Sequence, residues 1–346
     1  MFKPKYQLTP KILANISQIE RFYGQLEAIQ TPLKLELDVE KHNLIQSSYI
    51  SNSVEGNPLS YLEVSNLLLG DRVPANRNEK EVRNYFDILK KLGNYAHQKL
   101  SVSQVIEAHR ELLTGTNDEI AGRLRNKKIV VGRYKSLEGK TKLLIKHNPP
   151  FYRSGQIENA LKELLNWVSE EKEIPAVIKT GIFHHQFVYL HPFEDGNGRI
   201  CRIFTALILL SSGYLINKYF VLDDWYDIDR ILYSDKLHTA DSGDKTEWLE
   251  YFTDGIKYSL QSALSRYSTS FESMNFENRP TTKEKEVLKI FGIQREVTAS
   301  ELAIKLGVSR QQAHSLLASL INKGFVSKKG LTKSSYYFLK KRGERV

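Results

Sequence analysis

The chain has 346 residues, which is enough for two or three domains with a sizeable buried core. Its one cysteine excludes a disulfide framework and a cysteine metal cluster. The formal net charge is +10, and residues 279–346 alone carry 10 Lys and 5 Arg against 5 Glu, so the rest of the chain is neutral overall. No apolar run approaches the roughly 18 residues that span a membrane, and the polar N-terminus does not resemble a signal peptide, so we expect a cytoplasmic protein without membrane contact.

Most of the chain before residue 268 is predicted to be helical. Apolar residues recur at helical spacing in four segments, residues 6–44, 102–113, 156–168 and 225–252. The mostly polar segment 268–280, which ends in a proline, is the best candidate for a linker between domains.

The segment 128–148 departs from the helical pattern. Two short apolar groups, Ile129–Val131 and Leu143–Ile145, flank residues 132–142, which are rich in Gly, Ser and Lys. Such a pattern predicts a β-hairpin.

Two largely apolar segments, residues 176–190 and 200–210, enclose a short polar loop and are predicted to be core helices, the second with Gly213 as its C-cap. The loop, His191–Arg199 with Arg202 one turn later, places an imidazole, a carboxylate, a two-glycine turn and two guanidinium groups within 12 positions. Its end would open the second helix, where unpaired N–H groups and the helix dipole favour phosphate. These groups suit the handling of a nucleoside triphosphate and a metal ion.

Residues 191–202 match the signature of the Fic family, H-x-F-x-(D/E)-G-N-(G/K)-R-x-x-R, at every fixed position. The chain is therefore similar to Fic proteins, which implies transfer of AMP from ATP to a Ser, Thr or Tyr hydroxyl of a target protein or of the enzyme itself. The resemblance implies ATP and Mg²⁺ as cofactors. Gly198 favours AMP transfer over phosphorylation, because Doc-type relatives that phosphorylate resemble the others but carry Lys at this position.

Residue chemistry and the resemblance assign the same roles within the motif. His191 is the expected general base for the incoming hydroxyl, and Asp195 is the expected Mg²⁺ ligand. Arg199 and Arg202 lie three residues apart on one helical face and are expected to clamp the distal phosphates. The predicted ATP-binding residues are Asp195, Gly196, Asn197, Gly198, Arg199, Arg202 and Tyr233. Tyr233 falls where relatives line the adenine pocket, although the surrounding residues depart from the usual tyrosine pair.

A second match to the family lies upstream, where Ser51–Gly56 fits the inhibitory-helix motif (S/T)-x-x-x-E-(G/N). Ser51 and Glu55 are one helical turn apart, and Gly56, with the Asn-Pro pair that follows, is expected to end a helix at about residues 44–56. A Glu55 carboxylate that reaches Arg202 would occupy the guanidinium that otherwise holds the γ-phosphate. The alternative is an ordinary surface glutamate near a helix end.

The resemblance also implies a role for the predicted hairpin. In the family a hairpin at this place, the flap, covers the active site and aligns the target segment through main-chain pairing. The candidate docking residues are Ile129, Val130, Val131 and Gly132. Gly122, Arg123 and Arg125, just before the hairpin, resemble the usual approach to the flap. A plain surface hairpin is the alternative.

The basic C-terminal segment has the pattern of a winged helix-turn-helix. A helix is predicted over residues 282–291, capping boxes at 298–301 and 309–312 open two more, and residues 325–339 are predicted to form a hairpin with a basic tip. The helix over 309–322 would be the recognition helix for DNA. The candidate nucleic-acid contacts are Arg310, Gln311, His314, Lys328 and Lys329. Protein contact or dimerisation is the alternative use, but the concentration of positive charge favours DNA.

Together these patterns predict an all-α protein, a Fic-type helical bundle with a β-hairpin flap and a small C-terminal winged helix-turn-helix domain. The expected domains are residues 1–95 with the inhibitory helix, the catalytic domain 96–266, and 280–340. We expect a protein adenylyltransferase that is autoinhibited by Glu55. Two alternatives stay open, a DNA-binding transcriptional regulator whose Fic site senses nucleotide and a Fic enzyme that removes AMP. A homodimer is left open as well, because no motif decides the oligomeric state.

Overall fold

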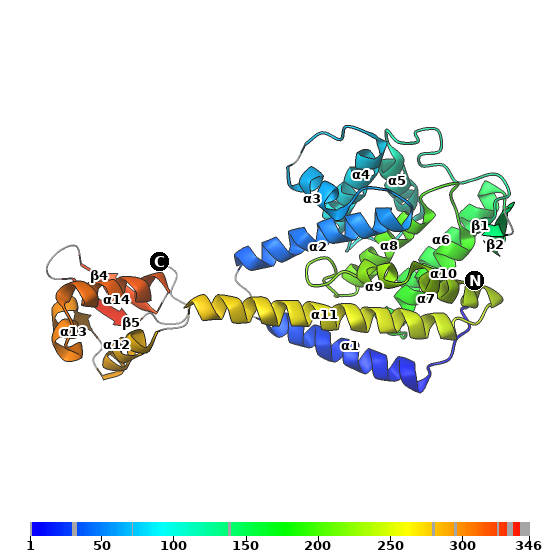
Figure 1. Ribbon diagram of the computed structural model, residues 1–346. Coiled ribbons are helices and arrows are strands. Elements are labelled where there is room, and N and C mark those ends of the chain that lie inside the picture. Colours follow the sequence, from blue (N-terminus) through cyan, green and yellow to red (C-terminus); the bar gives the residue numbers. More distant parts are fainter. Residues whose placement is uncertain are drawn as a thin grey trace. The chain divides into compact units, whose positions relative to one another are not determined.

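The computed structural model describes residues 2–29, 33–70, 72–137, 140–278, 281–293, 296–323, 325–330 and 335–339. The chain divides into two compact units, residues 1–266 and 267–346. Both units are mainly helical (Figure 1), which confirms the all-α prediction. No helix within the described ranges is long and apolar enough to cross a membrane.

The first unit is a helical bundle that carries one hairpin. Its described helices are α1 (Pro10–Ala28), α2 (Leu33–Val54), α3 (Tyr61–Leu69), α4 (Arg77–Lys91), α5 (Val102–Leu113), α6 (Ser154–Glu170), α7 (Ala176–Leu190), α8 (Asn197–Ser211), α9 (Asp223–Ile228), α10 (Arg230–Thr239) and most of α11 (Thr246–Asn278). Two short 3-10 turns are η1 (Leu92–Asn94) and η2 (Ala240–Ser242). The antiparallel hairpin consists of β1 (Val131–Leu137) and β2 (Lys140–His147).

Helices α7 and α8 form the centre of this bundle and pack against each other. α7 is buried on nearly every face between Val177 and Leu190, as expected for a helix that is apolar all round. α6 packs on α7, whereas α2, α4 and α5 pack on α8. The loop between α7 and α8 therefore begins and ends in the buried core.

The first and last helices of the bundle lie side by side although they are far apart in sequence. α1 runs along α11 (Figure 1), and Nδ2 of Asn15 donates to Oγ1 of Thr253 at 3.1 Å and to Oδ1 of Asp254 at 3.0 Å. This contact closes the bundle around α7 and α8.

Several helix predictions are confirmed, and two differ. Segments 102–113, 156–168, 176–190 and 200–210 lie in α5, α6, α7 and α8, and Gly213, two residues beyond the end of α8, has positive φ. Residues 6–44 are divided between α1 and α2, with residues 30–32 outside the described part. Residues 225–252 are divided among α9, α10 and α11, because Oδ1 of Asp229 accepts hydrogen bonds from the first N–H groups of α10.

The prediction of a linker at residues 268–280 is wrong for residues 268–278. α11 continues to Asn278, and residues 279–280 lie outside the described ranges. The segment is polar but contains neither Gly nor Pro before its end, so nothing in it breaks a helix.

The hairpin is confirmed, but its strands are longer and its turn is shorter than expected. Gly132, expected at the start of the turn, already pairs within the sheet. Ile129 and Val130, expected in the first strand, precede β1. The register shifts between Val131 and Gly132, where a Cβ on the glycine would overlap a carbonyl oxygen of β2. Residues 138–139 at the tip lie outside the described ranges.

The second unit is a winged helix-turn-helix over its described residues. Its elements are α12 (Thr282–Ile293), β3 (Val297–Thr298), α13 (Ala299–Leu306), α14 (Arg310–Asn322), β4 (Val326–Lys329) and β5 (Tyr336–Leu339). The antiparallel strand order is β3-β5-β4. A core of its own includes Val287, Phe291, Leu302, Leu317, Leu320 and Tyr337.

The capping boxes predicted for this unit are both present. The side chains of Thr298 and Ser309 accept from the N3 backbone, and Glu301 and Gln312 reach back to the N-cap N–H. Gly307 ends α13 in the left-handed conformation, with φ 63°. Lys328 and Lys329, expected at the basic tip of the hairpin, lie within β4 and pair with β5, and residues 331–334 lie outside the described ranges.

Candidate active site

The turn between α7 and α8 depends on two residues in the left-handed backbone conformation. His191 caps the C-terminus of α7 with φ 47° and ψ 63°, and Gly196 precedes α8 with φ 75°. Glycine adopts this conformation freely, whereas for His191 it is unfavourable. The contacts around the loop must therefore hold His191 in place.

One of these contacts lies within the loop. The side chain of Asn197 accepts from the N–H of Phe193 and donates to its carbonyl oxygen, both at 2.9 Å. Asn197 is 3% exposed and Phe193 is fully buried. The Asn197 side chain, which was predicted to contact ATP, thus lies inside the loop and fixes its shape.

His109 on α5 packs against the loop. The sequence did not predict a role for this residue. Its ring stacks on Phe193 with centroids 3.7 Å apart. Nδ1 accepts from the N–H of Gly122 at 3.0 Å, so Nε2 carries the hydrogen and donates to the carbonyl oxygen of Asp195 at 3.1 Å. Burial lowers the pKa of His109 to about 4, so the neutral ring persists at neutral pH. His109 could not be predicted, because a single histidine in a helix forms no sequence motif and its contact with the loop is visible only in the folded structure.

Arg125 fixes the end of α7. Its Nε donates to the carbonyl oxygen of His191 at 2.6 Å, and its Nη2 donates to that of Leu190 at 3.1 Å. Its backbone N–H donates to the carbonyl oxygen of Pro192 at 3.0 Å. Because helix carbonyls at a C-terminus lack partners, this buried guanidinium stabilises the strained turn at His191.

The ring of His191 is oriented for proton transfer. Nδ1 lies 3.2 Å from the carbonyl oxygen of Val188 and must donate to it, which leaves the lone pair on Nε2. Burial lowers the pKa of His191 to about 4. The imidazole is therefore neutral at physiological pH and able to accept a proton.

The inhibitory motif on α2 meets the loop motif at Arg202. Nη2 of Arg202 lies 2.7 Å from Oε1 of Glu55, and Nε donates to Oγ of Ser51 at 2.6 Å. Nη2 also donates to the carbonyl oxygen of Ser51 at 2.9 Å. α2 ends at Val54, and Glu55 and Gly56, the latter with φ 92°, form the turn that follows it. Four predicted residues from two distant segments thus come together.

Gly198 lies directly beneath the Glu55 carboxylate. A Cβ at this position would overlap Oε1 of Glu55 and would lie 3.0 Å from Nη1 of Arg202. Any larger residue would have to displace the carboxylate from Arg202. The absence of a side chain at residue 198 therefore allows Glu55 and Arg202 to form their ion pair.

Asp223 at the start of α9 is a second acidic neighbour of Arg202 that the sequence analysis missed. Its Oδ1 lies 3.8 Å from Nε of Arg202, and Oδ2 accepts from Oγ of Ser47 at 2.6 Å. Burial raises the pKa of Asp223 to about 6, against the lowering effect of Arg202. Burial alone would lower the pKa of Arg202, but Glu55 and its other neighbours together raise it.

Arg199 keeps free hydrogen-bonding capacity. Its Nη1 lies 3.4 Å from Oε2 of Glu81 and its Nη2 lies 3.6 Å from Oδ1 of Asp195. Among the described residues, its buried Nε and Nη1 have no hydrogen-bond partner. Unpaired buried donors are costly, so an anion at the start of α8 would stabilise them. The side chain of Asp195 is 45% exposed and leaves carboxylate oxygen available to a hard cation.

Tyr233 lies deeper than its predicted role suggests. It is 7% exposed, and its hydroxyl lies 2.8 Å from Nε2 of His184 on α7. Its ring is 4.3 Å from that of Tyr226. The residue therefore packs in the core next to the candidate site, and any adenine contact stays a prediction.

The predicted contact residues of the flap and of the second unit lie at the surface to different degrees. Val130 and Gly132 are exposed, whereas Ile129 and Val131 are half-buried. On the facing strand Leu143, Leu144 and Ile145 are exposed apolar residues, which suits peptide docking. In the second unit all five candidate nucleic-acid residues are exposed, namely Arg310, Gln311, His314, Lys328 and Lys329.

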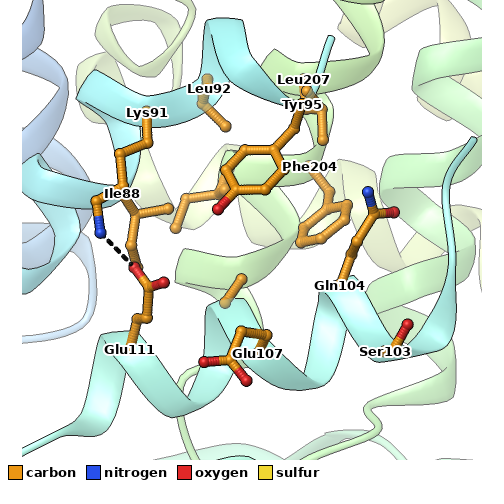
Figure 2. A pocket seen from close by; sticks show the side chains of 12 residues that line it. Ile88, Lys91, Leu92, Tyr95, Ser103, Gln104, Glu107, Glu111, Phe204 and Leu207 are labelled. Carbon is orange, nitrogen blue, oxygen red and sulfur yellow. Dashed lines mark hydrogen bonds and ion pairs between the residues drawn. The ribbon is translucent and has the colours of Figure 1, made fainter. Parts of the chain in front are cut away.

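A separate cavity of about 310 Å³ lies between α4, α5 and α8 (Figure 2). Ile203, Phe204 and Leu207 of α8 contribute apolar walls, and Lys91 pairs with Glu111 at 3.1 Å beside it. None of its lining residues belongs to the motifs above. The cavity shares helices α4, α5 and α8 with the candidate site, but its lining residues differ from those that contact the loop.

Comparison with known families agrees with this geometry. Residues 99–209 match the model of the Fic/DOC family. Residues 286–330 match the model of the IclR helix-turn-helix domain.

Curated relatives share modest identity. The protein adenylyltransferase fic-1 of Caenorhabditis elegans is 26% identical over 252 residues, which cover 69% of this chain and 45% of the relative. The protein adenylyltransferase Fic of Nematostella vectensis is 25% identical over 256 residues, 71% of this chain and 54% of the relative. The chain thus spans about half the length of the curated relatives it matches.

Solved structures share the fold. A Fic family protein from Desulfovibrio desulfuricans G20 aligns with a TM-score of 0.68 and 23% identity, covering 99% of this chain and 100% of that one. Part of Fic-1 from Caenorhabditis elegans aligns with a TM-score of 0.61 and 21% identity, covering 75% of this chain and 73% of that one.

Proposed function

We propose that this protein is an adenylyltransferase that moves AMP from ATP to a Ser, Thr or Tyr hydroxyl of a target protein, and that Glu55 inhibits it. The observation that carries the proposal is the ion pair between Glu55 and Arg202 above a loop whose His191 is neutral. The names of the curated relatives support the same reaction. A homodimer stays a prediction.

The start of α8 fits a nucleoside triphosphate. The free N–H groups of Arg199 and the helix N-terminus offer donors to phosphate oxygens, and Gly198 allows close approach of the backbone. Asp195 would hold the Mg²⁺, which when bound neutralises charge on the phosphates. Arg202 would hold the γ-phosphate once Glu55 has left.

The chemical step needs a base next to the α-phosphate. The target hydroxyl oxygen forms a bond to the α-phosphorus, the bond from that phosphorus to the oxygen bridging to the β-phosphate breaks, and pyrophosphate leaves. Nε2 of His191 takes the hydroxyl proton, because Nδ1 is already committed to Val188. Arg125 and His109 keep the loop in position for this transfer.

Inhibition follows from competition for one guanidinium. With Glu55 in place, Nη2 of Arg202 donates to Glu55 and Ser51, and neither hydrogen is available to a phosphate. ATP would then bind without its γ-phosphate clamp and with its α-phosphate poorly aligned. The exposed apolar residues Leu143, Leu144 and Ile145 of β2 would position the target segment.

A second function, DNA binding, is favoured by the second unit. Its match to the IclR helix-turn-helix domain and the exposed basic residues on α14 and β4 support this role. The removal of AMP from a target would use the same site and has no observation of its own.

The reaction can be tested with two differently labelled nucleotides. The Glu55→Gly variant, which lacks the inhibitory carboxylate, and a cell lysate are incubated with ATP labelled at either the α- or the γ-phosphate, and modified residues are located by mass spectrometry. AMP transfer predicts protein-bound label from α-labelled ATP only. Label from γ-labelled ATP would indicate phosphorylation, and no transfer with tight ATP binding would favour a nucleotide-sensing regulator.

A further inference from the structure

A cluster of histidines around one aspartate lies outside the candidate active site. His147 is the last residue of β2, His185 belongs to α7, His238 belongs to α10 and Asp241 lies in η2. The side chain of His147 is 2% exposed, whereas those of His238 and Asp241 are 13% and 21% exposed. The cluster is therefore closed toward the core and partly open toward solvent on one side.

Three atoms of this cluster converge. Nδ1 of His147 lies 2.8 Å from Oδ2 of Asp241, and Nδ1 of His238 lies 3.0 Å from the same oxygen. All three atoms lie within 4.8 Å of one another. A metal ion about 2.1 Å from each nitrogen and from the oxygen would subtend N–metal–O angles of roughly 85–90°. Each of these angles is that of two adjacent ligands in an octahedral site.

The other ring nitrogen of His147 and the other carboxylate oxygen of Asp241 form hydrogen bonds, as is usual for side chains that bind a metal ion. Nε2 of His147 donates to the carbonyl oxygen of Tyr189 at 2.8 Å, which leaves the lone pair on Nδ1. That lone pair faces Oδ2 of Asp241 at 2.8 Å, so the nitrogen and the oxygen direct their electron pairs toward the same point. Oδ1 of Asp241 accepts from Nε2 of His185 at 3.0 Å, and Lys245 in turn donates to Nδ1 of His185 at 2.7 Å.

We propose that His147, His238 and Asp241 bind a divalent first-row transition-metal ion. Two imidazoles and one carboxylate select such an ion over Mg²⁺ or Ca²⁺, which prefer oxygen ligands. The ion would join the last residue of β2 to α10 and η2, and would thereby pin the base of the hairpin to the helical core. The site is separate from the nucleotide chemistry and does not depend on it.

The test uses the full-length, tag-free protein after treatment with a chelator. Zn²⁺ is titrated by calorimetry in excess Mg²⁺, and we expect one equivalent to bind. His238→Gln and Asp241→Asn should each weaken the affinity by about 10-fold or more, because each removes a ligand. His97→Gln, at an exposed histidine elsewhere in the same unit, is the matched control and should leave the affinity unchanged.

Two results would overturn the proposal. One is wild-type affinity for Zn²⁺ no higher than that of Asp241→Asn, which would identify the cluster as a hydrogen-bonded support only. The other concerns wild-type protein alone, so it holds even if a variant fails to fold. X-ray absorption of the Zn²⁺-loaded protein should show two imidazole nitrogens around the metal, and a shell of oxygen atoms alone would contradict the assignment.

Discussion

Nη2 of Arg202 lies 2.7 Å from Oε1 of Glu55, although the two residues are 147 positions apart in the chain. Ser51 on the same helix holds Arg202 at two further points. The side chain of Glu55 is 32% exposed and stands at the end of α2, next to Gly56 with its positive φ. The carboxylate can therefore leave the guanidinium without unpacking the helix, which is what a reversible inhibitory contact requires.

Replacing His191 with Ala should abolish AMP transfer but leave ATP binding largely intact, since other residues hold the phosphates. Loss of a general base typically lowers the rate by roughly 10²–10⁴-fold. Initial transfer rates in the Glu55→Gly background, together with ATP affinity by calorimetry, measure both effects. His97→Ala, at an exposed histidine, serves as the control. Unchanged transfer in the His191 variant would remove the proposed base.

Asp223→Asn should loosen the grip on the γ-phosphate once Glu55 is absent. Asp223 is then the acidic neighbour left beside Nε of Arg202 at 3.8 Å, so losing its charge allows the guanidinium to move. In the Glu55→Gly background we expect a KM for ATP roughly 10-fold higher, or ~1.4 kcal/mol of binding. Asp224→Asn is the matched control, because that neighbouring carboxylate faces Gln46 and Arg266. Equal KM values in the two variants would show that Asp223 does not position Arg202.

Lowering the pH from 7 to 5 should destabilise the first unit. Burial lowers the pKa of His109 and of His185 to about 4 in the folded state, whereas the unfolded value is near 6.5. Between these values the unfolded chain binds more protons, so the free energy of unfolding falls as the pH falls through about 6.5. The pKa of Asp223, raised to about 6, gives a smaller change of opposite sign. His191, whose pKa burial also lowers to about 4, adds to the loss. The net loss should be on the order of 4 kcal/mol, seen as a lower urea midpoint. A midpoint that rises at pH 5 would contradict these shifts.

The positions that could be predicted from sequence are those where local pattern and chemistry coincide. α7, α8 and both capping boxes follow from apolar spacing and N-cap chemistry, which act over a few residues. The pairing of Glu55 with Arg202 was predicted only because each lies in a recognisable family motif. Apolar spacing alone did not reveal the break at Asp229 or the continuation of α11.

The residues that were missed act through tertiary contacts. His109 on α5 and Asp223 on α9 acquire a role only beside the loop and beside Arg202. Arg125 was named only for its place before the flap, and its contact with the carbonyl oxygen of His191 could not be predicted. The cluster around Asp241 likewise draws on four elements. Residue spacing within a single helix or strand does not predict which side chains from different elements will come together.

Lys328→Ala combined with Lys329→Ala should weaken DNA binding by the full chain. Both lysines are exposed on β4, and each contact with a DNA phosphate contributes through counterion release. The slope of log affinity against log salt should become shallower by about one per lost contact. The paired control changes two exposed lysines of the first unit, Lys99 and Lys162, to Ala. Equal losses in both double variants, or no DNA binding at low salt, would assign the second unit to protein contact.

The most direct test of autoinhibition is the rate of auto-adenylylation, measured with α-labelled ATP for wild type, Glu55→Gly, Arg202→Ala and the double variant. We expect Glu55→Gly to be ~10-fold faster than wild type or more, equivalent to ~1.4 kcal/mol of barrier, and Arg202→Ala to cancel the gain. Glu119→Gly, at an exposed glutamate in a turn, should behave as wild type. Equally low rates in wild type and Glu55→Gly, in protein shown to bind Mg-ATP, would contradict inhibition by Glu55.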